Sequence, residues 1–237
     1  MSVPAGQSPR MNSHLTELAF ILDRSGSMQS MAADAIEGFN FFLREQQHAP
    51  GHARLTLVLF DDEYLVPVQS IPVEEVIPLD HTTYVPRNST ALLDALGRTI
   101  DELGARLAAL PAAARPGKVI VTILTDGLEN VSVHETWRTV SQRIRHQIEK
   151  YAWEFLFLGA NQDAIAPAAR LHIAAANAAT YQPDGVGIRS TTRGISRKSS
   201  GLRARAAGVA TPEEEQAAAA PMQELVQDED RKGREQS

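Results

Sequence analysis

The sequence predicts an α/β fold in which a doubly wound, mostly parallel sheet carries helices on both faces. Short aliphatic runs that end in Asp or Gly alternate along the chain with longer segments whose apolar residues recur every three or four positions. The first pattern is typical of buried parallel strands, and the second of amphipathic helices that cover a sheet. The chain has 237 residues, of which 43% are hydrophobic, and this is enough for one sizeable core.

Four aliphatic runs have the length and composition of buried strands. They are residues 18–23 (LAFILD), 54–61 (RLTLVLFD), 118–126 (KVIVTILTD) and 154–160 (EFLFLGA). Residues 63–76 have no helical stripe, follow the second run after a tight turn, and contain Pro67 and Pro72. This segment is predicted to be an antiparallel edge strand, because proline is tolerated at the edge of a sheet.

Helical stripes occupy the intervals between these runs, at 32–43, 92–110 and 137–151. Further along, Ile188, Ile195 and Leu202 recur every seven residues. Residues 187–207 therefore either form one more amphipathic helix with an arginine-rich outer face or stay outside the fold.

The chain divides into four parts by composition. Residues 1–13 are expected to be a disordered leader and 14–181 the folded domain. Residues 182–208 form a basic segment with net charge +5, and they contain the candidate helix 187–207 described above. Residues 209–237 carry net charge −5, are rich in Glu, Gln and Ala, and are expected to be a disordered acidic tail.

Composition also excludes several classes of function. The net charge of −6 disfavours nucleic-acid binding, which depends on neutralising phosphates. The longest apolar runs are far shorter than the roughly 20 residues of a membrane helix, so no membrane association is expected. The chain contains no Cys, which excludes thiolate metal sites and cysteine nucleophiles. Together with the absence of an apolar signal segment, this is consistent with a cytoplasmic location.

Three predicted strands end in a carboxylate, at Asp23, Asp61 and Asp126. Because ligands of open α/β sheets collect outside the carboxyl ends of the strands, these side chains are expected at one edge. Carboxylates gathered in this way repel one another unless a cation or several hydrogen-bond donors neutralise them.

The run DRSGSM places oxygen-bearing side chains at Asp23, Ser25 and Ser27. In an extended segment alternate residues point to one side, so that these oxygens can converge. Oxygen ligands of this kind favour Mg²⁺ or Mn²⁺, followed by Ca²⁺, over zinc. The alternative is structural, since either serine could cap the helix that follows, just as Thr90 could cap the helix of 91–110.

Together these motifs resemble the von Willebrand factor A domain with its metal-ion-dependent adhesion site. The resemblance covers roughly residues 14–181 and rests on DRSGSM after the first strand, STALLDAL at 89–96 and LTDG at 124–127. It implies a six-stranded sheet with one antiparallel edge strand. It also implies that Ser25, Ser27 and Thr90 touch the metal directly, and that Asp23 and Asp126 bind it directly or through water. Asp61 lies outside this ligand set and is expected to play a supporting role.

The resemblance implies a non-enzymatic adaptor whose metal coordinates an Asp or Glu of a partner protein. Intracellular members of the family act in larger assemblies, some with AAA-type ATPases, although no marker in this sequence selects such a partner. The alternative is a Mg²⁺-dependent phosphatase with Asp23 as nucleophile and Asp126 as metal ligand. That chemistry requires an acidic group two residues after the nucleophile, where this chain has Ser25, and the sequence therefore favours a protein that is not an enzyme.

Overall fold

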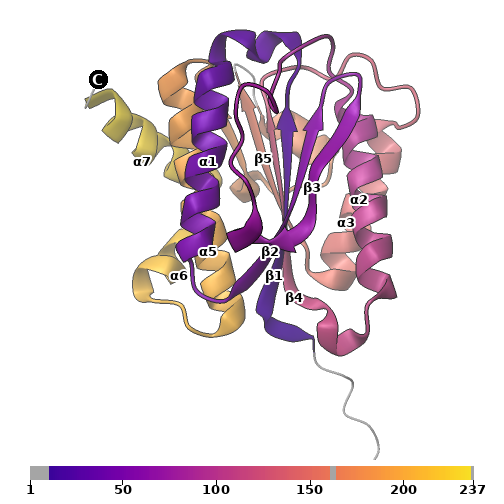
Figure 1. The fold of residues 1–237 in the computed structure, drawn as a ribbon, viewed down its shortest axis with the longest axis vertical. Coiled ribbons are helices and arrows are strands. Elements are labelled where there is room, and N and C mark those ends of the chain that lie inside the picture. Colours follow the sequence, from indigo (N-terminus) through magenta and orange to yellow (C-terminus); the bar gives the residue numbers. More distant parts are fainter. Residues whose placement is uncertain (1–10, 161–163, 236–237) are drawn as a thin grey trace, which may run out of the picture.

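The computed structural model describes residues 11–160 and 164–235, in which a six-stranded sheet lies between two layers of helices (Figure 1). The strands are β1 (Asn12–Asp23), β2 (His52–Phe60), β3 (Tyr64–Pro72), β4 (Pro116–Thr125), β5 (Glu154–Ala160) and β6 (Ala178–Tyr181). Their order across the sheet is β3-β2-β1-β4-β5-β6, and all neighbours are parallel except β2 and β3. The predicted doubly wound sheet with one antiparallel edge strand is confirmed.

Helices cover both faces of this sheet, as predicted. One face carries α1 (Ala32–His48), α5 (Gly185–Ala207), α6 (Pro212–Ala219) and α7 (Met222–Glu235), and the other carries α2 (Leu92–Ala109), α3 (Trp137–Tyr151) and α4 (Ile165–Arg170). Short 3-10 turns occur at Gly26–Met31, Val73–Glu75, Ala112–Ala114 and Ala175–Asn177. Over the described ranges, none of the helices combines the length and the apolar character needed to cross a bilayer.

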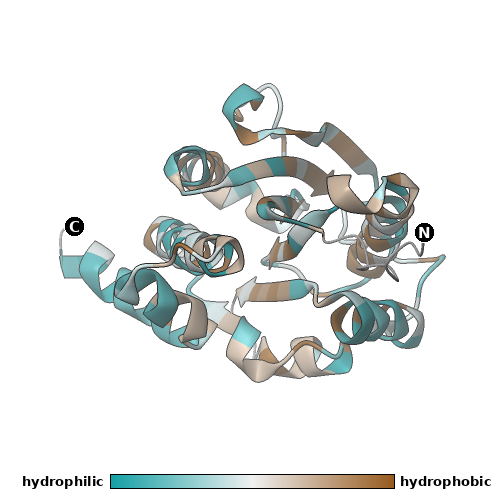
Figure 2. Ribbon diagram, turned by 90° about the horizontal axis from the view of Figure 1, so that it is seen from below, coloured by the Kyte–Doolittle hydropathy of each residue, from teal (hydrophilic) through white to brown (hydrophobic). Residues whose placement is uncertain are grey.

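The central strand β1 shows why the predicted runs become buried strands. Phe20 and Leu22 point into the core under α1 and α5, whereas Ala19 and Ile21 point into the core under α2 and α3. Because successive side chains alternate between the two faces, a strand covered on both sides must be apolar throughout. Figure 2, viewed from below, shows these hydrophobic strands between the two helical layers.

The sixth strand has no recognisable signal in the sequence. β6 is only Ala178–Tyr181, and its alanines are buried by the sheet and by neighbouring helices. Four residues, two of them alanines, are too short and too weakly apolar a run to mark a strand in the sequence. Its existence was implied by the family resemblance alone.

The predicted leader 1–13 overlaps the first strand of the sheet. Residues 1–10 of the predicted leader 1–13 lie outside the described residues. Asn12 already belongs to β1, and its backbone N–H donates to the carbonyl of Arg115 at 2.9 Å.

The basic segment 182–208 is part of the fold rather than an appendage to it. α5 covers most of this segment and buries Ile188, Ile195 and Leu202 against the sheet. Its arginines have partners within the domain, so the arginine-rich outer face expected from the sequence is largely paired. Arg197, for example, contacts Asp228 and Glu229 of α7.

The acidic segment 209–237 also departs from the expected disordered tail. Residues 212–235 form α6 and α7, and Met222, Leu225 and Val226 are buried against α5. This packing is close because α5 has glycines where the helices meet. A Cβ on Gly201 would lie 2.4 Å from the carbonyl oxygen of Glu214. The composition of the tail gave no sign of it, because these few apolar residues are surrounded by charged ones.

Candidate metal site

Asp23 is the buried centre of the predicted site, at the carboxyl end of β1, the strand whose arrow points to the top of Figure 1. Its side chain is fully shielded from solvent. Oδ1 accepts the backbone N–H of Ser25 at 2.7 Å, and Oδ2 accepts the hydroxyl of Thr125 at 2.5 Å. Both oxygens therefore have fixed positions at the edge of the sheet.

The DRSGSM turn brings two hydroxyl groups beside the carboxylate of Asp126, which directly follows β4. Ser25 Oγ and Ser27 Oγ lie 3.1 Å apart, and the Ser27 hydroxyl donates to Asp126 Oδ1 at 2.7 Å. Ser25 stands at the start of the 3-10 turn but makes no capping hydrogen bond with its side chain. The capping alternative does not account for these two serines, which face the carboxylates instead.

Thr90 reaches the same place from the loop before α2. Its backbone N–H donates to Asn130 Oδ1 at 3.0 Å, which ties it to the loop after β4. Gly127 leaves room for the approach, since a Cβ on Gly127 would lie 2.6 Å from Thr90 Oγ1 and 3.4 Å from Asp23 Oδ2. The cap position of α2 is Ala91, with no side-chain hydrogen bond, so the capping role considered for Thr90 is wrong.

Burial disfavours the charged form of both carboxylates of the site. Burial raises the pKa of Asp23 to about 6, although hydrogen bonds from Thr125 and Ser25 act in the opposite direction. Burial also raises the pKa of Asp126, opposed by the hydrogen bond from Ser27. A buried negative charge is costly unless a cation offsets it. No Lys or Arg side chain contacts either carboxylate among the ion pairs of the described residues.

The available ligands suit a hard divalent cation. The five predicted residues provide carboxylates from Asp23 and Asp126 and hydroxyls from Ser25, Ser27 and Thr90. Oxygen donors of this kind are the preferred ligands of Mg²⁺ and Mn²⁺. In the part of the chain that the structure describes, no three His, Asp or Glu side chains gather closely enough to hold a metal ion. The candidate site differs from such clusters because it combines two carboxylates with hydroxyl groups.

Asp61 supports the site from the end of β2 and does not join it. It is fully buried and lies between two arginines, with Oδ2 at 3.2 Å from Arg24 and 3.0 Å from Arg87. The backbone N–H of Arg87 donates to the carbonyl of Arg24 at 2.8 Å. The network therefore joins the turn that carries Ser25 to the loop that carries Thr90. Sequence reasoning expected a supporting role for Asp61 but did not identify the arginines.

Two buried tyrosines fix the strand ends from beneath, and neither was predicted. The Tyr84 hydroxyl donates to the backbone carbonyl of Asp23 at 2.6 Å, and that of Tyr181 donates to the carbonyl of Thr125 at 3.3 Å. Burial holds the pKa of both phenols well above the usual range, so they remain donors. A lone tyrosine in a loop and one at the end of an unrecognised strand gave no usable signal.

Comparisons by sequence find no matching family model and no matching curated protein. Solved structures do match. A von Willebrand factor type A protein from Catenulispora acidiphila has a TM-score of 0.53 at 19% identity, covering 78% of this chain and 42% of that one. The manganese-loaded TRAP protein of Plasmodium vivax has a TM-score of 0.50 at 14% identity, covering 72% and 69%.

A third match is proximal thread matrix protein 1 from the mussel byssus, with zinc in its metal-ion-dependent adhesion site. Its TM-score is 0.51 at 12% identity, over 78% of this chain and 46% of that one. The present chain thus spans less than half the length of the Catenulispora and mussel proteins. The strand order, the antiparallel edge strand and the similar solved structures all indicate the same fold. This chain has the fold of a von Willebrand factor A domain.

Proposed function

We propose that this protein is a metal-dependent protein-binding module and has no catalytic activity. Asp23, Ser25, Ser27, Thr90 and Asp126 would hold one divalent cation, with Mg²⁺ or Mn²⁺ favoured over Ca²⁺. The observation that carries the proposal is the continuous group of oxygens from Ser25 through Ser27 to Asp126, placed beside buried Asp23.

The ligand set explains why such an ion would attract an acidic partner. Two carboxylates formally cancel the charge of a divalent cation, and the three hydroxyls are neutral. The bound ion would supply an electrophilic position for one further oxygen, most suitably from an Asp or Glu of another protein. The chain's own contribution is to hold its carboxylates rigidly, through the hydrogen bonds to Asp23 and the tyrosine contacts below it.

Two of the structurally similar proteins are described as holding a divalent ion, which supports the proposal. One is described as manganese-loaded and the other as having a zinc-occupied site. They differ in the ion, so the preference for Mg²⁺ or Mn²⁺ in this chain rests on its oxygen ligands. An adaptor role in the cytoplasm, including an assembly with an AAA-type ATPase, belongs to the same proposal.

The absence of catalysis is proposed from the residue two positions after Asp23. A phosphatase that used Asp23 as nucleophile would need a general acid there, and Ser25 cannot serve as one at neutral pH. Assays with a generic phosphate ester and with ATP are expected to give only background. Turnover that disappears in Asp23→Asn would instead support the hydrolase.

Capture of partners from native extract tests the binding function. Wild type in Mg²⁺ is compared with wild type in EDTA, with Thr90→Ala, and with Thr82→Ala, which removes an exposed hydroxyl of the preceding loop. Partners identified by mass spectrometry should be retained by wild type and Thr82→Ala, and lost in EDTA and in Thr90→Ala. Retention of the same partners in all four samples would show that recognition does not involve the metal site.

A further inference from the structure

Three aliphatic side chains are exposed on the loop that follows Asp126. Leu128 is 66% exposed, Val131 38% and Val133 80%. Large hydrophobic residues that are scattered over a surface need no explanation, but three within six residues form a patch. We call Leu128, Val131 and Val133 the apolar loop patch. It begins two residues from a proposed metal ligand.

The backbone of this loop is fixed by two carboxylates. Glu129 accepts the N–H groups of Val131 at 3.1 Å, Ser132 at 2.8 Å and Leu93 at 2.8 Å. Asp94, in the first turn of α2, accepts three further N–H groups, from residues 133, 134 and 135, at 2.8 to 3.0 Å. A loop pinned in this way holds its side chains in water and loses little conformational entropy when a partner covers them.

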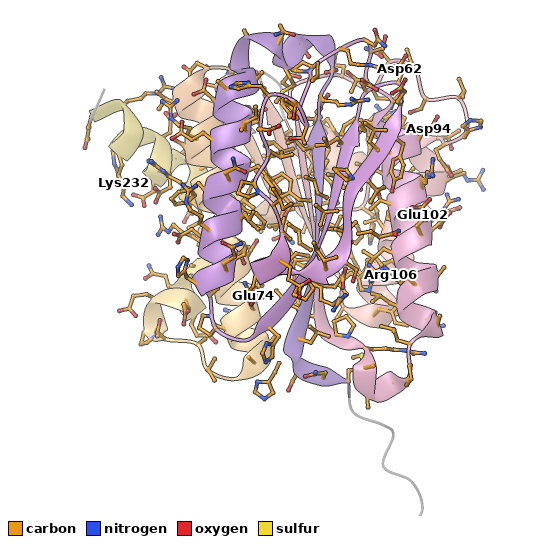
Figure 3. All side chains as sticks on the ribbon, in the orientation of Figure 1. Asp62, Glu74, Asp94, Glu102, Arg106 and Lys232 are labelled. Carbon is orange, nitrogen blue, oxygen red and sulfur yellow. The ribbon has the colours of Figure 1, made fainter. Side chains whose placement is uncertain are left out.

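An acidic hollow of about 550 Å³ adjoins the patch and runs along α2, with Val131 and Val133 in its lining. Figure 3 shows Asp62, Asp94 and Glu102 following one another down this side of the molecule. Carboxylates exceed cations in its lining, which holds one arginine, Arg98, paired with Glu102. The other carboxylates of the lining are Asp62, Glu63, Asp94, Asp101 and Glu135. Arg87 and Arg143, which contact some of these carboxylates from outside, leave the excess in place.

We infer that this surface is the specificity-determining part of the binding face. Its ligand is an extended protein segment that carries an acidic residue for the metal, an apolar residue beside it for the apolar loop patch, and a basic residue beyond that for the acidic hollow. The inference rests on the proposed function, because the metal anchors the acidic residue. The patch supplies contact area, and the hollow selects the charge of the next side chain.

The test uses a phage-displayed library of random short peptides, selected on the full-length protein in Mn²⁺ and eluted with EDTA. Eluted peptides should share an Asp or Glu with an aliphatic or aromatic neighbour and a Lys or Arg further along. A labelled peptide from this group is then titrated with wild type, with the double variant Leu128→Ser/Val133→Ser, and with Val209→Ser. Val209 is 53% exposed before α6 and serves as the matched control.

The double variant should bind the peptide at least about tenfold more weakly, whereas the control should bind like wild type. Replacing the basic residue of the peptide by Ala should weaken binding to wild type as well. Mn²⁺ titration of both variants should remain unchanged, which separates loss of the patch from loss of the metal.

The possible failures are distinct. Peptides that elute with EDTA but lack the apolar and basic neighbours, or that bind the double variant as tightly as wild type, overturn this inference and leave the metal-dependent function standing. If EDTA elutes no peptide at all, the proposed function is contradicted, and the inference falls with it.

Discussion

Gly127 illustrates how a single residue controls the candidate site. It follows Asp126 directly, and the absence of a side chain lets Thr90 approach the carboxylate of Asp23. The sequence showed it only as the last letter of LTDG. The structure shows why the residue is glycine. A Cβ at this position would lie 2.6 Å from Thr90 Oγ1, which is too close for a real contact.

Gly127→Ala is expected to weaken Mn²⁺ binding by about tenfold or more while the fold persists, because the stiff, β-branched Thr90 must move away. Gly104→Ala is the control, since its Cβ would meet only the end of the Gln147 side chain at an ordinary 3.4 Å. Calorimetric Mn²⁺ titrations, with circular dichroism to check folding, compare the two. Equal affinities in both variants would show that Thr90 does not bind the ion.

Asp61 is the residue on which the neighbouring network depends. Asp61→Ala would leave Arg24, which is 5% exposed, buried without its main counter-charge. Removing one partner of a buried ion pair costs about 3–5 kcal/mol of unfolding free energy. Glu63→Ala also removes a contact with Arg24, but Glu63 is exposed, and the variant should unfold almost like wild type. Urea unfolding measures the stability of both variants. Similar midpoints for the two would show that Asp61 is not the main counter-charge of Arg24.

Among the helices and strands, sequence patterns predicted those with long apolar runs or stripes of their own. They missed the elements whose structure depends on packing against other parts of the chain. The strands that became β1, β2, β4 and β5 are continuous aliphatic runs, and α1 to α3 carry long apolar stripes. β6 and α7 were missed, because four residues with two alanines, or three apolar residues among charges, acquire their structure only from packing. The five proposed metal ligands were named from motifs. The tyrosines and arginines that position them are separated from those motifs along the chain.

At the contact between α5 and α6, a Gly to Ala substitution is expected to destabilise the protein, although helix propensity alone predicts the opposite. Gly to Ala inside a helix usually stabilises it by up to about 1 kcal/mol. In Gly201→Ala the new Cβ would lie 2.4 Å from the backbone oxygen of Glu214, so α6 must move and the protein should lose stability. Gly104→Ala in α2 should keep or raise the melting temperature. A Gly201→Ala variant as stable as wild type would show that the α5–α6 contact is not close-packed.

In the whole molecule, the fold places the carboxyl ends of β1 and β4 side by side at one edge of the sheet and holds them rigidly. The sheet is buried on both faces, its strand ends are held by Tyr84 and Tyr181, and the loops are tied together through Asp61 and Asn130. α5, α6 and α7 complete one helical layer instead of trailing from the domain. A metal at this edge would therefore bind to side chains that the fold already holds in place.

Calorimetric titration with Mn²⁺ of wild type, Asp23→Ala and Asp101→Ala tests whether the metal binds at this edge of the sheet. Asp101 is an exposed carboxylate of α2 that contacts Arg143, and it controls for the loss of one negative charge. Wild type and Asp101→Ala should each bind one ion, and Asp23→Ala should bind none over the same concentration range. Binding by Asp23→Ala with the affinity of wild type would contradict the assignment of the metal site.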